Sequence, residues 1–253
     1  MDTPLAATEE ALVREKKQKA LDGFLERLLA DQARESIARI VLFGSLSDGE
    51  AREEESDVDV LVFGTDRLRE LSESCAAAAF ETALEWGESV EPLVYCSDEL
   101  RFPHSYFLAL ALRRGKELYR MDETALRRKE AEAALGLAEE YVRAARHALE
   151  HSFYRLAVDA AYNAVELCVK GLLLLKLDQI PKAHGGVVQM FGQLYVVSGL
   201  VDPQIGRQIN VHLELRNKAR YDFHARIASE DAQETIESAD ALIAFLSREL
   251  SRE

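Results

Sequence analysis

The sequence predicts a mixed α/β (α+β) unit with a small mixed sheet, followed by an all-α helical bundle. Up to about residue 124, short runs rich in β-branched apolar residues alternate with amphipathic helical segments, and beyond it only helical segments follow. The length of 253 residues fits two domains. We expect one domain over residues 1–124 and a second over residues 125–253.

The first unit is expected to begin with a helix that runs to about Asp31. Its apolar residues recur with the spacing of one helix face: Leu21, Phe24, Leu25, Leu28 and Leu29. The apolar runs that follow are short, as buried strands are, and an irregular, acid-rich passage, Leu46 to Ser56, separates the first two. In chain order the expected elements are strands Ile40 to Phe43 and Val58 to Phe63, helix Arg67 to Glu85, strand Val90 to Tyr95, helix Phe107 to Arg114 and strand Glu117 to Tyr119.

The second unit is expected to be a small antiparallel bundle. Glycine and proline interrupt its amphipathic pattern at Pro181, at Gly185-Gly186 and between Gly199 and Pro203, because neither residue type continues a helix without cost. The expected helices are Ala125 to Glu150, Tyr154 to Leu177, Val187 to Ser198, Pro203 to Phe223 and Glu230 to Leu250.

Charge and cysteine content limit the class of protein. The formal net charge is −14, and most of it lies in the first half of the chain. Such a surface disfavours binding to a polyanionic backbone, so a small or protein substrate is favoured over duplex DNA. The three cysteines show no Cys-x-x-Cys spacing, which argues against a zinc site or a disulfide framework. The start of the chain lacks signal-peptide features and no apolar run spans a bilayer, so we expect a cytoplasmic protein without a membrane segment.

Two short motifs lie beside the first two expected strands. Gly44-Ser45 follows the first strand, and Asp57-Val58-Asp59 comes after eleven intervening residues. A Gly-Ser turn exposes backbone N–H groups and a hydroxyl to phosphates. Side chains alternate along a strand, so Asp57 and Asp59 project from the same face and can share a magnesium ion. Such ions, often two, neutralise triphosphate charge and activate an attacking hydroxyl in nucleotidyl transfer.

A third carboxylate, Glu91, stands at the start of the strand Val90 to Tyr95. If this strand lies beside the Asp57-Val58-Asp59 strand, Glu91 is the candidate ligand of a second metal ion or the catalytic base. Each motif alone is common, and the alternative is that Asp57 and Asp59 are strand-edge acids that cap neighbouring turns. The combination favours a metal-dependent catalytic site.

Residues 40–95 resemble the minimal nucleotidyltransferase branch of the DNA polymerase beta superfamily. The resemblance assigns roles to the residues already singled out: the triphosphate to Gly44 and Ser45, and magnesium to Asp57, Asp59 and Glu91, the last in place of the more usual aspartate.

The charge after Gly-Ser departs from this family. Many members have basic residues there, whereas this chain has Asp48, which repels a triphosphate unless a metal or Arg52 compensates. The later segment Arg114 to Tyr119 resembles the closing piece of the family.

Nearly all of residues 126–250 resembles the HEPN (higher eukaryotes and prokaryotes nucleotide-binding) family. The segments that carry this resemblance are Asp159 to Lys170, Lys182 to Val187, Phe191 to Gln193 and Leu215 to Asp222. Proteins that join the two domains are known as toxin–antitoxin systems and as relatives of antibiotic nucleotidyltransferases. The resemblance therefore implies a toxin–antitoxin-like protein, and a homodimer, because HEPN-like bundles commonly pair.

Ribonuclease members of the HEPN family carry an arginine followed, after four to six residues, by a histidine. Here seven residues separate Arg216 from His224 and three separate Arg220 from His224, so neither pair fits. Spacing by four still puts all three on roughly one helix face, which would form a degenerate site; a polar face or a dimer contact is the favoured alternative. The resemblance also makes Tyr221 a candidate nucleotide acceptor, although a packed structural tyrosine is favoured.

His147 and His151 are four residues apart on an expected helix, a spacing that suits a metal ion. The sequence shows no third ligand beside them. A solvated helix face is therefore the favoured interpretation.

Together these observations predict a magnesium-dependent nucleotidyltransferase that transfers AMP from ATP, or a nucleotide from another NTP, to a hydroxyl acceptor. The acceptor is left open between a protein tyrosine, an RNA end and a small molecule. Two alternatives stand beside this prediction: a non-catalytic nucleotide-binding or antitoxin-like module, and a HEPN ribonuclease that uses Arg216 or Arg220 with His224.

Overall fold

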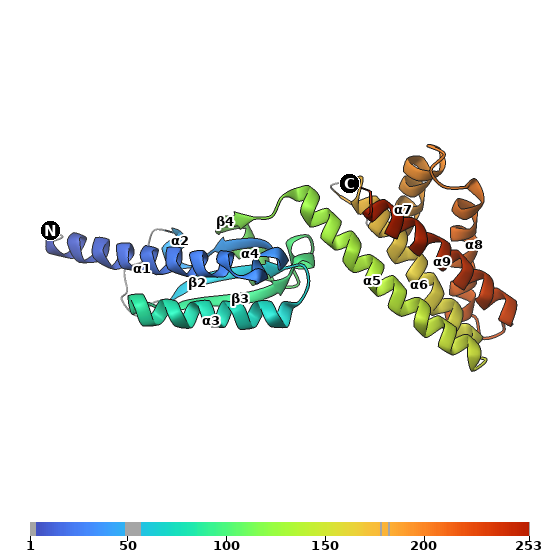
Figure 1. Ribbon diagram of the computed structural model, residues 1–253, viewed down its shortest axis with the longest axis horizontal. Coiled ribbons are helices and arrows are strands. Elements are labelled where there is room, and N and C mark those ends of the chain that lie inside the picture. Colours follow the sequence, from blue (N-terminus) through green and yellow to red (C-terminus); the bar gives the residue numbers. More distant parts are fainter. Residues whose placement is uncertain (1–3, 49–56, 178, 182, 253) are drawn as a thin grey trace. The chain divides into compact units, whose positions relative to one another are not determined.

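The computed structural model describes residues 4–48, 57–177, 179–181 and 183–252, with side chains from residue 11 onward apart from that of residue 48. The chain divides into two compact units, Met1–Asp122 and Glu123–Glu253. The strands all belong to the first unit, and the second is helical (Figure 1). The expected fold class, a mixed unit followed by a helical one, is confirmed.

The first unit is built on a four-stranded mixed sheet. Its strands are β1 (Ile37–Leu42), β2 (Val58–Gly64), β3 (Val90–Cys96) and β4 (Lys116–Arg120), in the spatial order β3-β2-β1-β4. β1 pairs antiparallel with β2 and with β4, whereas β2 and β3 are parallel. Helix α3 (Leu68–Trp86) connects the parallel pair, because parallel neighbours need a crossover connection.

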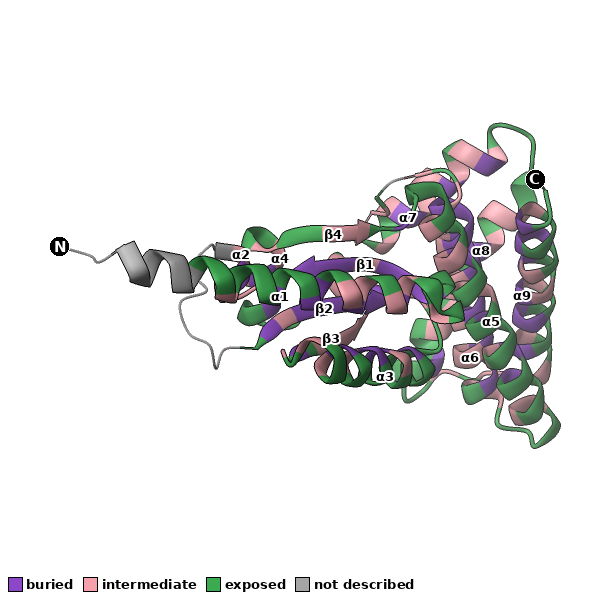
Figure 2. Ribbon diagram, turned by 60° about the vertical axis from the view of Figure 1, so that its left-hand side comes forward, coloured by how far each residue is buried: buried purple, intermediate pink, exposed green. Residues whose placement is uncertain are grey.

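One face of this sheet forms the core of the first unit. Val58, Val60 and Val62 alternate along β2 and join a buried apolar cluster with residues of α3 and of α1 (Pro4–Ala30). In Figure 2, β1 and β2 are coloured almost entirely as buried. The alternation that buries the valines turns Asp59 to the opposite face.

Helix α4 (Tyr106–Arg114) lies just before β4 in the chain. Ser105 caps its first turn by accepting a hydrogen bond from the backbone N–H of Leu108 at 3.2 Å. The helix ends at Arg114, and the next residue, Gly115, lies so close to Val41 that a Cβ atom there would overlap the valine side chain. This close approach fixes the last turn of α4, including Arg114, against β1.

The second unit is a bundle around a central helix. Its helices are α5 (Glu123–Glu150), α6 (Tyr154–Leu174), α7 (His184–Phe191), α8 (Pro203–Tyr221) and α9 (Ser229–Leu250). Helix α6 packs against α5, α8 and α9, and its apolar residues form the core with theirs. A turn of π-helix, Gly192–Val196, follows α7 directly, where a single continuous helix was expected.

Other parts of the structure also differ from the expected elements, and three of the differences lie near the candidate site residues in the chain. β1 begins at Ile37 rather than Ile40, because a 3-10 helix whose N-cap is Asp31 leads directly into it. The passage expected to be irregular opens with a short helix, α2 (Ser45–Asp48), and residues 49–56 lie outside the described residues. Helix α8 ends at Tyr221 rather than Phe223, because Asp222 adopts an extended conformation.

No helix in the described ranges combines the length and apolar character needed to cross a membrane. Cys75, Cys96 and Cys168 are free thiols. Burial raises the pKa of Cys75 to about 12, and burial together with the charge of Glu139 raises that of Cys168 to about 12. The two buried cysteines are therefore protonated packing residues at neutral pH.

Candidate active site

The three predicted carboxylates lie at the same end of two neighbouring strands. Asp57 immediately precedes β2, Asp59 is the second residue of β2, and Glu91 is the second residue of β3. In the parallel register, Asp59 pairs directly with Glu91. Paired residues of adjacent strands point to the same face, so the structure brings Glu91 beside Asp59.

Electrostatic repulsion marks this group of acids. Burial raises the pKa of Asp59 above its ordinary value, and the charges of Glu91 and Asp57 raise it further. Within the described part of the chain, none of the three carboxylates forms an ion pair with a basic residue. Carboxylate oxygens are the ligands that Mg²⁺ prefers, and a divalent cation would relieve this repulsion. The donor set therefore fits magnesium.

Gly44 is fixed directly against these carboxylates. Its φ of +77° lies in the left-handed region, and a Cβ atom at this position would overlap Oδ2 of Asp59. The backbone N–H of Phe43 donates to the carbonyl oxygen of Asp59 at 3.1 Å, and that of Ser47 donates to the carbonyl oxygen of Gly44 at 3.1 Å. Ser45 begins α2 at this turn. Both the conformation and the close approach require glycine.

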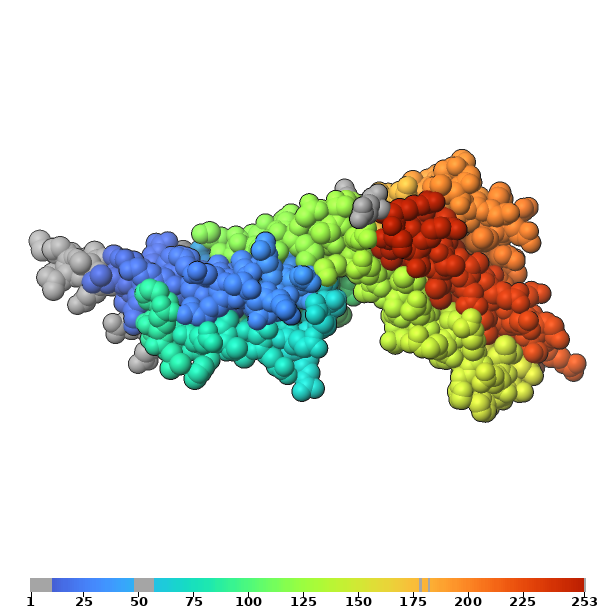
Figure 3. Space-filling view, in the orientation of Figure 1, coloured from blue at the N-terminus to red at the C-terminus, as the bar shows by residue number. Residues whose placement is uncertain are grey.

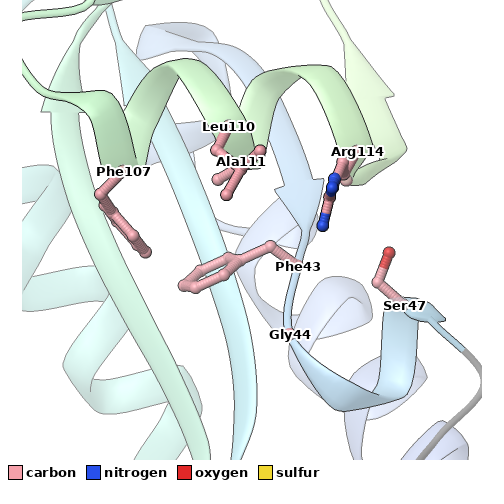
Figure 4. Close-up of a pocket in the computed structure, with 8 residues that line it drawn as sticks. Phe43, Gly44, Ser47, Phe107, Leu110, Ala111 and Arg114 are labelled. Carbon is pink, nitrogen blue, oxygen red and sulfur yellow. The ribbon is translucent and has the colours of Figure 1, made fainter.

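A small cavity of about 130 Å³ adjoins the Gly44 turn (Figure 4). At one end, the rings of Phe43 and Phe107 meet edge to face with centroids 5.3 Å apart. At the other end, Arg114 and Ser47 point toward one another. Gly44 itself lines the cavity, so the cavity is continuous with the turn that contacts Asp59.

Arg114 is a candidate functional residue of this unit that the sequence analysis did not name as a site residue. The expected compensating base, Arg52, lies outside the described residues, and so does the side chain of Asp48. Arg114 forms no ion pair in the described part of the chain, which leaves its guanidinium available to an anion. Its segment had been singled out by resemblance, but the residue itself carried no signal of its own.

In the second unit, Arg216 and Arg220 are both bonded to Asp159 of α6. Nε of Arg216 donates to Oδ1 of Asp159 at 3.2 Å, and Nη2 of Arg220 donates to Oδ2 at 3.0 Å. The guanidinium of Arg216 also lies over the ring of Tyr162, 5.8 Å from its centroid. The Tyr162 hydroxyl is 3.1 Å from Nε2 of His184, within hydrogen-bond distance. These contacts tie α6, α7 and α8 together.

His224 does not share a helix face with the two arginines, contrary to the prediction. Asp222 accepts hydrogen bonds at Oδ1 from the backbone N–H groups of His224 at 2.8 Å and Ala225 at 3.1 Å, so the chain turns where the helix was expected to continue. Tyr221, the last residue of α8, is 66% exposed, and His224 is also exposed. The prediction that Tyr221 is a packed structural tyrosine is therefore wrong.

Arg155 of α6 fixes this end of α8, and the sequence analysis missed it as well. Its Nη1 donates to the carbonyl oxygens of Ala219 at 2.8 Å and Asp222 at 2.9 Å, and its Nη2 donates to that of Ala225. A guanidinium at the C-terminus of a helix satisfies carbonyl groups that have no partner within the helix.

Comparisons with known proteins agree with the two units. The nucleotidyltransferase domain family matches residues 21–117, and the HEPN domain family matches residues 131–250. Two relatives come from Methanocaldococcus jannaschii. One, named "Putative toxin MJ0605", is 37% identical over 116 residues, which are 46% of this chain and 85% of that protein. The other, "Putative toxin MJ0142", is 32% identical over 106 residues, which are 42% of this chain and 71% of that protein.

Proposed function

This chain belongs to the proteins in which a nucleotidyltransferase domain is followed by a HEPN domain, and on that premise we propose that it transfers AMP from ATP to a hydroxyl acceptor with magnesium. The observation that supports the proposal is the convergence of Asp57, Asp59 and Glu91 beside the Gly44 turn. The names of the relatives support a role in a toxin–antitoxin-like system.

In the proposed reaction, the acceptor oxygen bonds to the α-phosphorus of ATP, the bond from that phosphorus to the bridging oxygen breaks, and pyrophosphate leaves. Asp57 and Asp59 would hold magnesium, with Glu91 either completing a second metal site or accepting the proton of the acceptor hydroxyl. Bound magnesium supplies charge neutralisation and lowers the pKa of the attacking hydroxyl. The raised pKa of Asp59 supports this assignment, because a bound cation would offset the repulsion among the three carboxylates.

Arg114 has a positioning role in this proposal. A triphosphate brings negative charge to a turn that already faces acids, and Arg114 is the cation at the edge of the adjoining cavity. The cavity of about 130 Å³ is smaller than the roughly 300–1,000 Å³ of pockets that enclose whole ligands. It would take one flat ring of a substrate beside Phe43 and Phe107, with a phosphate near Arg114.

The test is an incubation of purified protein with magnesium and ATP labelled at its α-phosphate. We expect label to move to the protein or to an added acceptor, and to fall to background in Asp57→Asn/Asp59→Asn. Asp66→Asn is the matched control, because Asp66 is an exposed acid just beyond the other end of β2. Loss of labelling in the control variant, or retention in the double variant, would contradict the proposal.

The same assay tests Arg114. Arg114→Ala should raise the KM for ATP about tenfold, which corresponds to about 1.4 kcal/mol and to the loss of one charge-assisted hydrogen bond. Arg113→Ala, which removes the neighbouring exposed arginine of α4, should leave KM unchanged. Equal effects of the two substitutions would indicate a general loss of positive charge rather than a contact at the cavity.

A second candidate function is a non-catalytic nucleotide-binding or antitoxin-like module. Asp48, directly after the turn that would hold the phosphates, favours it. ATP that binds without transfer of label to any acceptor would support this reading. The ribonuclease alternative has less support, because Asp159 engages both Arg216 and Arg220 and the chain leaves the helix before His224.

A further inference from the structure

The end of α5 brings together two imidazoles and a carboxylate. His147, Glu150 and His151 each offer a ligand atom, and these atoms all lie within 4.8 Å of one another. Nδ1 of His147 is 4.0 Å from Oε2 of Glu150, and the two histidine rings are 4.4 Å apart between centroids. Glu150 is the third ligand that the spacing of the histidines alone did not reveal.

The backbone beneath these side chains is fixed by a helix-terminating motif. Ser152 has a φ of +61°. Its N–H donates to the carbonyl oxygen of Leu149 at 2.9 Å, and the N–H of Phe153 donates to that of Ala148 at 2.8 Å. These two bonds and the left-handed residue form a Schellman motif. The three side chains therefore project from a defined end of α5.

His151 is also oriented as a metal-binding histidine usually is. Its Nδ1 lies 2.9 Å from the carbonyl oxygen of His147, and its ring stacks against that of Phe153 with an interplanar angle of 12°. When Nδ1 donates to this carbonyl, Nε2 carries the free lone pair. Metal-binding histidines typically make this kind of second hydrogen bond, which sets the tautomer and the direction of the ring.

The electrostatic setting favours a cation. The group lies at the C-terminus of a 28-residue helix, where the helix dipole is negative. In the described part of the chain, no lysine or arginine forms an ion pair with Glu150. The side chains of His147 and Glu150 are 76% and 72% exposed, and the α5–α6 turn lies at the surface (yellow-green in Figure 3). A dissolved ion can reach them.

We propose that this end of α5 binds a divalent transition-metal ion of the Zn²⁺ class through His147, Glu150 and His151. Two imidazoles and one carboxylate are ligands for zinc and its neighbours, whereas Mg²⁺ and Ca²⁺ prefer oxygen alone. Ligand atoms about 2.1 Å from a tetrahedral ion lie roughly 3.4 Å apart, so small rotations of these exposed side chains close the site. The fourth position is left open to water or to an outside ligand.

The test is a calorimetric titration of the full 253-residue chain with Zn²⁺ alone, without nucleotide. Wild type should bind one more Zn²⁺ per chain than His147→Ala/His151→Ala, and Glu150→Gln should weaken binding at the site at least about tenfold. Saturating Zn²⁺ should also raise the melting temperature of wild type and not that of the double variant, because an ion that binds the folded state stabilises it.

Two variants serve as controls. His104→Ala removes another exposed histidine that contacts a glutamate, Glu99, but has no second histidine beside it. Asp57→Asn/Asp59→Asn removes the proposed magnesium ligands. Both should keep the bound Zn²⁺ equivalent. A wild type that binds no Zn²⁺, or a double histidine variant that binds as much as wild type, would overturn the proposal.

Discussion

Asp59 in the first unit and Asp159 in the second are each at the centre of a cluster of charged side chains, but the clusters differ in sign. Asp59 lies beside Glu91 and Asp57 and has no basic partner in the described residues, whereas Asp159 receives hydrogen bonds from Arg216 and Arg220. One carboxylate is repelled by its neighbours and the other is neutralised by them. A cluster of acids that repel one another favours a bound cation or a proton, and a carboxylate paired with two arginines holds helices together.

Among these predictions, Gly44→Ala should have the largest effect, a loss of transfer activity. Gly44 and Gly87 both have positive φ, +77° and +63°, but a Cβ atom at Gly44 would overlap the Asp59 carboxylate, while the nearest atom at Gly87 is Lys16 Nζ at 3.8 Å. Each substitution should cost about 1 kcal/mol of stability for backbone strain. Displacement of the carboxylate should add a loss of transfer activity of about 100-fold, in Gly44→Ala only.

Melting curves and initial rates of label transfer check this prediction for both variants. Gly87→Ala serves as the control for backbone strain, since it lies at the end of α3. If both variants lost activity equally, strain in the fold would explain the loss, and the contact between Gly44 and Asp59 would have no part in it.

Asp159→Ala tests the cluster that Asp159 forms with Arg216 and Arg220. It leaves two arginines without their partner, and the side chains of Arg216 and Asp159 are only 19% and 23% exposed. We expect the free energy of unfolding to fall by about 2 kcal/mol, less than for a fully buried pair because water still reaches the groups. The control is Asp240→Ala, which breaks the exposed pair with Arg146 and should cost at most about 1 kcal/mol.

Urea unfolding of the full chain, followed by helical circular dichroism, measures both costs. Equal costs for the two aspartates would mean that the Asp159 cluster is an ordinary surface pair. Transfer activity should be unchanged in Asp240→Ala, since that pair lies between α5 and α9.

The sequence was sufficient to predict those features of the site that depend on a local pattern of residues. Alternation along β2 predicted that Asp57 and Asp59 share a face, and the short apolar run at Val90 predicted the strand that carries Glu91. The structure shows that this strand, β3, is the parallel neighbour of β2, with Glu91 opposite Asp59. Strand pairing depends on the whole sheet, so the sequence supported Glu91 only as a conditional candidate.

The contacts that sequence analysis missed join segments that are distant in the chain. Arg216 and Arg220 are 57 and 61 residues from Asp159 in the chain, and Arg155 reaches the end of α8 across 64 residues to Ala219. Helical periodicity extended α8 through Phe223, but hydrogen bonds from Arg155 and the side chain of Asp222 end it at Tyr221. Periodicity describes a helix face and does not contain these competing contacts.

The smallest expected effect concerns the stability of the protein without metal. The pKa of Asp59 is raised in the folded state, so this group contributes stability below its ordinary pKa of 3.8, and that contribution is lost as the pH rises through the raised value. At pH 7, Asp59→Asn should therefore stabilise the metal-free protein, by less than about 1 kcal/mol because the carboxylate is only partly shielded from solvent. Urea unfolding at pH 7 and near pH 3 measures this difference, which should vanish at the lower pH.

Magnesium should raise the stability of wild type and leave that of Asp59→Asn nearly unchanged. Asp66→Asn, the exposed control, should show neither effect. A less stable Asp59→Asn at pH 7 would mean that the carboxylate already has a favourable partner within the fold, and the contrast with Asp159 would not hold.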